Sequence, residues 1–176
     1  MTNLTRILFI FTFLILNFST TYAHGPSRQK VSESIEINAS IEDVWKIISN
    51  FRVFNWNQNI KQTIADNNQV GSERILEFKS GEKVKQKLEK VDDKKKIIGW
   101  RIVETDNKVL PVNSYAAKIF VKSKDNKTTV LYKTGFYRGF MGNDPPPELN
   151  DENSKKLVKV FVSENLKGLK KIVEKN

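Results

Sequence analysis

Cysteine is absent from the 176-residue chain, which excludes thiol catalysis, thiolate metal sites and stabilising disulfides. Histidine occurs once, as His24, so no Ser–His pair can form inside a folded domain. A free amino terminus at His24 could bind copper together with the imidazole, but a metal site needs several converging ligands. An unbound surface histidine is the simpler interpretation. Gly-rich phosphate loops and dinucleotide-binding fingerprints are also missing. We therefore predict no catalytic constellation, no metal site and no cofactor.

The first 23 residues have the three parts of a secretory signal. A polar segment with one cation, Arg6, precedes an apolar run over residues 7–16, and small residues stand at positions −3 and −1 before His24. An uncleaved membrane anchor is the alternative, although the apolar run is short for a membrane-spanning helix. We predict cleavage before His24, export to a periplasm and no stable membrane insertion afterwards.

Basic residues outnumber acidic ones, 30 to 20, which gives a formal net charge of +10, or +9 once Arg6 is removed with the signal. Such a charge attracts acidic partners at low salt. The excess of lysine also fits the codon bias of an AT-rich genome, so composition alone is a second explanation. No Arg-rich or aromatic-stacking motif is present, and we predict no nucleic-acid partner.

Alternating apolar residues predict strands over residues 30–37 and over several segments between residues 61 and 136. Between these regions, Ser40 is the predicted N-cap of a short helix, with Asp43 three residues later. Residues 51–60 are rich in aromatic side chains and asparagine. We interpret them as a second short helix or an irregular turn.

The C-terminal part has the spacing of one long amphipathic helix over residues 150–173. Asn150 or Asp151 is its predicted N-cap. Such a helix can bury its apolar stripe only in the concave face of a curved sheet. The predicted fold is α+β: a curved antiparallel sheet of about six to seven strands wrapped round the long C-terminal helix, with two short helices after the first strand. Residues 24–29 form a predicted flexible terminus, and residues 30–176 a single domain.

Nine aromatic residues fall on predicted inward faces or in the helix–turn region. They either fill the core or line a cavity for a hydrophobic ligand, and the sequence leaves both open. These cavity candidates are Trp45, Phe51, Phe54, Trp56, Trp100, Tyr115, Tyr132, Phe136 and Phe161.

Residues 136–152, FYRGFMGNDPPPELNDE, join the last predicted strand to the long helix. Three consecutive prolines fix the backbone and remove donors, so this segment cannot be absorbed into a sheet. A stiff apolar surface loses little entropy on docking, which suits a partner-binding loop. The alternative is a plain spacer that ends a strand before a helix. The docking candidates are Arg138, Phe140, Met141, Pro145, Pro146 and Pro147.

The segment IEINASIEDVWKIISNF, residues 35–51, resembles the polyketide cyclase/dehydrase branch of the START-like, birch-pollen-allergen-like (SRPBCC) superfamily. This resemblance covers nearly all of residues 30–173 and implies the helix-grip fold, whose members bind lipids, sterols or polyketides and are only sometimes enzymes. Many members of that branch carry Trp-His-Pro in the turn after the first helix. Here the turn has Trp56, Asn57 and Gln58, which argues against a catalytic role for it.

Three segments are also similar to MxaD-type periplasmic proteins of methylotrophs: AHGPSRQKV, VLPVNSY and residues 136–152. The resemblance implies a non-enzymatic accessory that assists methanol dehydrogenase, through its cytochrome c acceptor or in its maturation. The expected partners are therefore methanol dehydrogenase or an acidic cytochrome c. The alternatives are a carrier of a lipid or quinone in the helix-grip cavity and, third, a cyclase- or hydratase-like enzyme.

Overall fold

The computed structural model describes residues 25–124 and 127–175. One antiparallel sheet contains seven strands: β1 (Gln29–Ile37), β2 (Ile60–Ala65), β3 (Glu73–Phe78), β4 (Lys83–Asp92), β5 (Ile97–Thr105), β6 (Val112–Lys124) and β7 (Lys127–Arg138). The strand order is β1-β7-β6-β5-β4-β3-β2, so the first strand pairs with the last. The remaining elements are α2 (Ile41–Ile48), the short 3₁₀ helix η1 (Pro147–Leu149) and α3 (Asp151–Val173).

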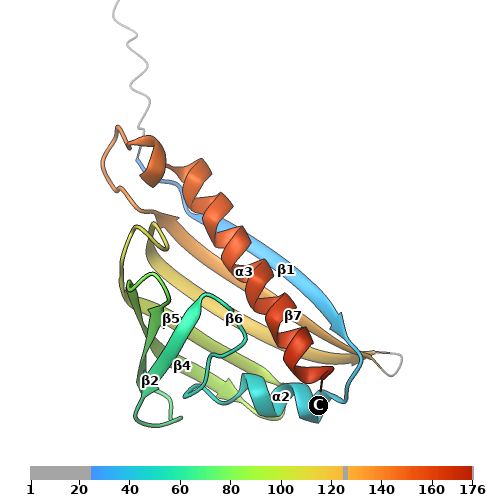
Figure 1. Ribbon diagram of the computed structural model, residues 1–176. Coiled ribbons are helices and arrows are strands. Elements are labelled where there is room, and N and C mark those ends of the chain that lie inside the picture. The colour runs from blue at the N-terminus through green and yellow to red at the C-terminus, as the bar shows by residue number, and fades with distance from the viewer. Residues whose placement is uncertain (1–24, 125–126, 176) are drawn as a thin grey trace, which may run out of the picture.

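The long helix α3 lies across the concave face of the curved sheet, next to β1 and β7 (Figure 1). Its apolar stripe is buried there, with Val158, Val162 and Leu169 fully covered. Asn150 is the N-cap, because its side chain accepts a hydrogen bond from the Asn153 amide at 2.8 Å. The predicted α+β fold with a long C-terminal helix held by a curved sheet is confirmed.

One short helix follows β1, not two. The Ser40 cap of α2 is confirmed, since its hydroxyl accepts a hydrogen bond from the Asp43 amide at 3.1 Å. The second predicted helix, over residues 51–60, is wrong, and its alternative, an irregular turn, is confirmed: Ile60 begins β2, and residues 51–59 are a series of turns. Its amides bind side chains instead of helical carbonyls, as when the Phe54 amide donates to the Thr63 hydroxyl at 3.2 Å. Side-chain acceptors of this kind compete with helix formation.

A bulge in β6 determines which residues of that strand face α3. The pairing of β6 with β7 shifts between Asn113 and Ala116, and Ser114 has a positive φ of 48°. The extra residue of the bulge shifts by one position the alternation of inward-facing and outward-facing side chains along β6. Tyr115 is therefore buried beside Ala117 on the inner face, and Ser114 is exposed.

The two ends of α3 lie at opposite ends of the molecule. The loop of residues 139–150 precedes the helix at one end, and α2 lies beside its C-terminal end (Figure 1). Within the described ranges, no helix has the length and apolarity needed to cross a membrane. The predicted signal of residues 1–23 and His24 lie outside the described residues, and β1 begins at Gln29, one residue before the predicted domain boundary.

Candidate functional site

All nine aromatic cavity candidates are buried. Phe54 is central: its ring centroid lies 4.7 Å from that of Trp56 and 6.5 Å from that of Trp100. Trp100 in turn meets Tyr132 edge to face at 5.6 Å. Trp45 points elsewhere, because its indole N–H donates to the Asp93 carboxylate at 2.8 Å near the β4–β5 turn.

Arg74 lies inside this aromatic cluster, and its side chain is fully buried. The guanidinium carbon stands 4.0 Å, 4.5 Å and 5.1 Å from the ring centroids of Phe51, Phe54 and Trp100. Arg74 Nε donates to Gln86 Oε1 at 2.8 Å, and Nη1 donates to the Phe51 carbonyl at 3.1 Å. Desolvation lowers the pKa of Arg74 to about 9, so the guanidinium still carries its charge at neutral pH.

A second group of buried polar side chains lies farther along the interior. The hydroxyl oxygens of Tyr115 and Tyr132 are 3.3 Å apart, and Asn57 Nδ2 donates to Asn165 Oδ1 of α3 at 2.7 Å. Burial raises the pKa of Tyr132 to about 12 and that of Tyr115 well above its usual value. Both phenols therefore stay protonated and can donate hydrogen bonds at neutral pH.

The sequence analysis missed Arg74 and Gln86, although the strand pattern contains the signal. In β3, Arg74 alternates with Leu76 and therefore faces the core. In β4, Gln86 stands between inward-facing Val84 and Leu88, directly opposite Arg74 in the β3–β4 register. A polar residue at an inward position of an alternating strand is the feature that identifies such a site.

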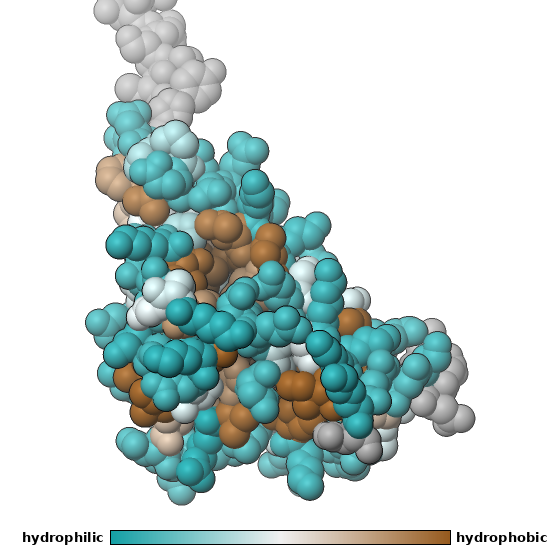
Figure 2. All heavy atoms as spheres, in the orientation of Figure 1, coloured by the Kyte–Doolittle hydropathy of each residue, from teal (hydrophilic) through white to brown (hydrophobic). Residues whose placement is uncertain are grey.

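An open depression leads toward this interior. Figure 2 shows hydrophobic residues gathered in a hollow between α3 and the neighbouring loops, surrounded by hydrophilic ones. The depression has a volume of about 460 Å³, and its apolar lining is Phe78, Val109, Leu157, Val160 and Phe161. The Phe161 ring is stacked on Phe54 at 6.5 Å, with 11° between the planes. One aromatic layer therefore separates the depression from the rings that contact Arg74.

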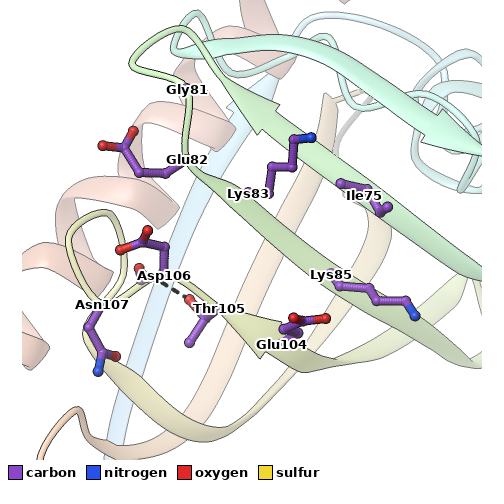
Figure 3. A pocket seen from close by; sticks show the side chains of 9 residues that line it. All are labelled: Ile75, Gly81, Glu82, Lys83, Lys85, Glu104, Thr105, Asp106 and Asn107. Atoms are coloured by element: carbon purple, nitrogen blue, oxygen red, sulfur yellow. Dashed lines mark hydrogen bonds between the residues drawn. The ribbon is translucent and has the colours of Figure 1, made fainter.

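A second depression lies on the surface between β3, β4 and β5 (Figure 3). Its lining mixes basic side chains, Lys83 and Lys85, with acidic ones, Glu82, Glu104 and Asp106. Lys85 is already paired with Glu73, at 2.6 Å. Across residues 25–124 and 127–175, no three His, Asp or Glu side chains gather as a metal site would require. This depression has neither the burial nor the uncompensated charge of the interior site.

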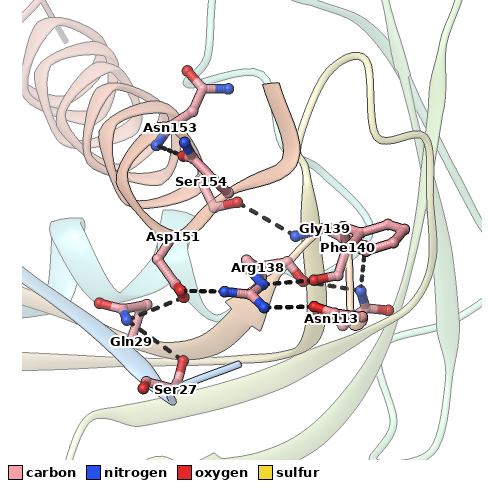
Figure 4. Close-up of polar contacts among 11 residues, drawn as sticks. Ser27, Gln29, Asn113, Arg138, Gly139, Phe140, Asp151, Asn153 and Ser154 are labelled. Atoms are coloured by element: carbon pink, nitrogen blue, oxygen red, sulfur yellow. Dashed lines mark hydrogen bonds and ion pairs between the residues drawn. The ribbon is translucent and has the colours of Figure 1, made fainter. Parts of the chain in front are cut away.

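The loop of residues 139–150 is held by Arg138, which is buried (Figure 4). Its guanidinium donates to the Phe140 carbonyl at 2.7 Å, to the Gly142 carbonyl at 2.6 Å and to Asp151 Oδ2 at 2.7 Å. Asn113 adds to this anchor, because its Nδ2 donates to the Gly139 carbonyl at 2.8 Å. Arg138 thus fixes the loop at its base, and its side chain is not part of the exposed surface.

The exposed part of the loop is apolar. Phe140 is 38% exposed and Met141 is 48% exposed, and both directly follow the anchor. Pro145 and Pro146 are half-buried, and Pro147 begins η1. The loop folds back on itself, since the Phe140 amide donates to the Leu149 carbonyl at 3.2 Å. It therefore presents two hydrophobic side chains on a fixed backbone.

Comparison with models of protein families identifies relatives of this chain. Residues 28–174 match the model of a family described as polyketide cyclase / dehydrase and lipid transport. The comparison with curated proteins finds no match.

Solved structures share the fold. An uncharacterised protein from Bacillus thuringiensis has a TM-score of 0.68 and 26% identity, over 83% of this chain and 99% of that chain. The protein XoxI from Bacillus cereus has a TM-score of 0.68 and 25% identity, over 82% and 95%. Zhui aromatase/cyclase from Streptomyces sp. R1128 has a TM-score of 0.67, over 84% and 94%; at 14% identity this likeness shows the fold alone.

Proposed function

The chain belongs to the polyketide cyclase/dehydrase and lipid transport family, and we propose that it binds a small, largely apolar organic molecule between its sheet and α3. The observation that carries the proposal is the chain of contacts from the open depression to Arg74. Phe161 lines the depression and stacks on Phe54, and Phe54 contacts Arg74. Apolar pockets with a few convergent polar groups are typical small-molecule sites.

The ligand enters by displacing the Phe161 ring. Phe161 lines the depression and is 8% exposed, whereas Phe54 behind it is fully covered. Rotation of one surface-edge aromatic is a fast and local motion, so binding needs no opening of the sheet. The bound molecule then replaces ring contacts with its own apolar surface, which keeps the interior dry.

Native mass spectrometry of the protein, purified from the cells that produce it, tests this function. An apolar ligand should remain bound with one copy per chain. Uptake of 2-naphthalenemethanol, followed by tryptophan fluorescence, provides a second measurement. Val160→Arg puts a charge on the rim of the depression and should weaken uptake. Val103→Arg is the matched control, because Val103 is exposed to a similar extent, 42% against 47%, on the outer face of β5. Equal uptake by both variants, or none by the wild type, would contradict the proposal.

An enzyme of cyclase or hydratase type is the alternative for the same site. Such an enzyme needs buried polar groups facing the ligand, and Arg74, Gln86 and the phenol of Tyr132 are groups of this kind. The two functions differ in the fate of the ligand. A binding protein releases its ligand chemically unchanged after prolonged incubation, whereas an enzyme releases a different compound: a hydratase changes the mass by one water, and a cyclised isomer separates by chromatography.

A second function, supported by a different surface, is that of a periplasmic accessory to a methanol dehydrogenase system. It is favoured by the exposed pair Phe140 and Met141 on a loop that Arg138 holds rigid. A positively charged protein would also meet an acidic cytochrome c faster than a neutral one, through long-range attraction. In this function the protein is not itself an enzyme.

Salt dependence tests the accessory function. The exported chain, with His24 as its first residue, should bind methanol dehydrogenase or its cytochrome c at low salt. Binding should weaken as the Debye length falls from about 10 Å at 0.1 M salt to about 3 Å at 1 M. The hypothesis fails if neither protein binds at low salt, or if binding does not depend on salt.

A further inference from the structure

Arg74 is a buried cation without a counter-charge. The side chain is 2% exposed, and within residues 25–124 and 127–175 it forms no ion pair with a carboxylate. Its two hydrogen bonds use Nε and Nη1, and Nη2 is buried with no acceptor among the described residues. Buried charges are normally paired, because desolvation of an isolated ion is costly. An unpaired buried guanidinium therefore indicates a partner that is not part of the chain.

Two buried donors beside Arg74 also lack an acceptor. Among the described residues, Gln86 Nε2 and Trp100 Nε1 are buried N–H groups without a hydrogen-bond partner. Gln86 and Trp100 both contact Arg74 directly, one by a hydrogen bond and one through its ring face. Native interiors leave few polar atoms unpaired, so two unpaired donors beside an unpaired cation require an explanation.

We propose that Arg74 binds the oxyanion of a planar organic acid, with Gln86 Nε2 and Trp100 Nε1 as further donors. The inference rests on the ligand-binding function proposed above and specifies its chemistry. A guanidinium presents parallel N–H groups that fit a carboxylate or an ionised enol, and such charge-assisted bonds are stronger than neutral ones. Phe51, Phe54 and Trp100 surround the guanidinium with ring faces, which favours a flat ligand.

The route of entry agrees with this orientation. Phe161 separates the open depression from Phe54, and Phe54 lies 4.5 Å from the Arg74 guanidinium carbon. A planar acid that displaces Phe161 would lie along Phe54 with its charged end against Arg74 and its apolar end toward the depression. The acid thus supplies the missing negative charge and acceptors and keeps an apolar body among the rings.

Matched ligands test the charge requirement. 2-Naphthoate and 2-naphthalenemethanol share one ring system and differ in the anionic group, and 2-hydroxy-1,4-naphthoquinone provides an ionised enol. Calorimetric titration of the wild type should show at least tenfold tighter binding of 2-naphthoate than of the neutral alcohol. Comparison of the two anions identifies the type of oxyanion. If 2-hydroxy-1,4-naphthoquinone binds more tightly than 2-naphthoate, the site is assigned to enolates, and if it binds more weakly, the site is assigned to carboxylates.

Three variants identify the residue responsible. Arg74→Met should abolish the preference for the acid while the neutral alcohol still binds, and Arg74→Lys should retain part of the preference. Arg101→Met is the control, because Arg101 is exposed and pairs with Glu89 at 2.9 Å. Thermal melts verify folding, and the double variant Arg74→Met with Gln86→Leu removes both polar partners together if the single variant does not fold.

The outcomes distinguish the proposal for Arg74 from the ligand-binding function on which it rests. If the wild type binds the neutral alcohol and shows no preference for either acid, the proposal for Arg74 is overturned and the ligand-binding function stands. If no probe binds to the folded wild type, both are overturned. Retention of the acid preference in a folded Arg74→Met variant also overturns the assignment, because another group would then supply the charge.

Discussion

Gly168 of α3 packs directly against the backbone of Trp56 in the turns that follow α2. A Cβ atom added at Gly168 would overlap the Trp56 carbonyl oxygen and lie 2.7 Å from its carbonyl carbon. The approach brings the helix and the turn close enough for the bond between Asn57 and Asn165, two residues that are 108 positions apart. Position 168 has no room for a side chain, because the atoms nearest to an added Cβ belong to the Trp56 backbone and cannot rotate away as a side chain could.

Gly168→Ala should therefore destabilise the protein, although alanine is the better helix former. The added methyl group meets backbone, so the helix or the turn must shift, and overpacking of this kind costs about 1–3 kcal/mol. Urea unfolding measures the loss of unfolding free energy. Lys167→Ala, at the exposed neighbouring position of the helix, is the control and should change stability little. A variant Gly168→Ala as stable as the wild type would show that the turn is free to move.

Arg138→Met should loosen the loop of residues 139–150. The substitution leaves two carbonyls and the Asp151 carboxylate without the guanidinium. Loss of one partner of a fully buried ion pair costs about 3–5 kcal/mol, and the value here should be lower because Asp151 is one-third exposed. Urea unfolding and limited proteolysis of the loop are the measurements. Arg101→Met, which breaks an exposed pair, should cost less than about 1 kcal/mol.

The buried phenol of Tyr132 should make stability fall at high pH. Burial raises its pKa from 10.0 to about 12, so between these values the folded state keeps a proton that the unfolded state loses. This contribution is complete below pH 10 and disappears as the pH rises through 12. The lowered pKa of Arg74 acts in the opposite direction over an overlapping range that begins at about pH 9. A comparison with Tyr132→Phe cancels that effect.

Between pH 9 and pH 11, the wild type should lose about 1 kcal/mol of unfolding free energy relative to Tyr132→Phe. Urea unfolding at several pH values measures it. A difference that stays constant over this range would mean that the phenol is not desolvated in the folded state.

Phe140→Ser together with Met141→Ser should leave the fold intact, because both side chains are exposed and such changes rarely exceed about 0.5 kcal/mol. If the protein has the proposed accessory function, stimulation of methanol dehydrogenase should fall, since apolar anchors carry much of an interface's binding energy. Replacing Pro145, Pro146 and Pro147 by alanine should weaken binding more modestly, through entropy. A thermal melt and the activity assay together distinguish a docking surface from a part of the core. A large loss of melting temperature with unchanged stimulation would show that the loop residues belong to the core.

Local sequence patterns determined most of the fold. The apolar spacing of α3 and the Ser40 cap of α2 depend on residues close in the chain, so they could be predicted directly, and the α3 cap could be narrowed to Asn150 or Asp151. The strands followed from alternation for the same reason. The turns of residues 51–59 could not be predicted as well, because the acceptors that hold them, such as Thr63 and Asn68, come from later in the sequence.

Only the tertiary structure decided what the interior contains. The sequence placed the nine aromatic residues on inward faces or in the helix–turn region. It left filled core and ligand cavity open, because side-chain packing depends on how seven strands and α3 meet. The pairing of Arg74 with Gln86 required the β3–β4 register, and the surrounding rings come from two separate parts of the chain, the turns after α2 and β5. Whether a buried charge is neutralised is a property of that three-dimensional neighbourhood, which no local pattern of residues encodes.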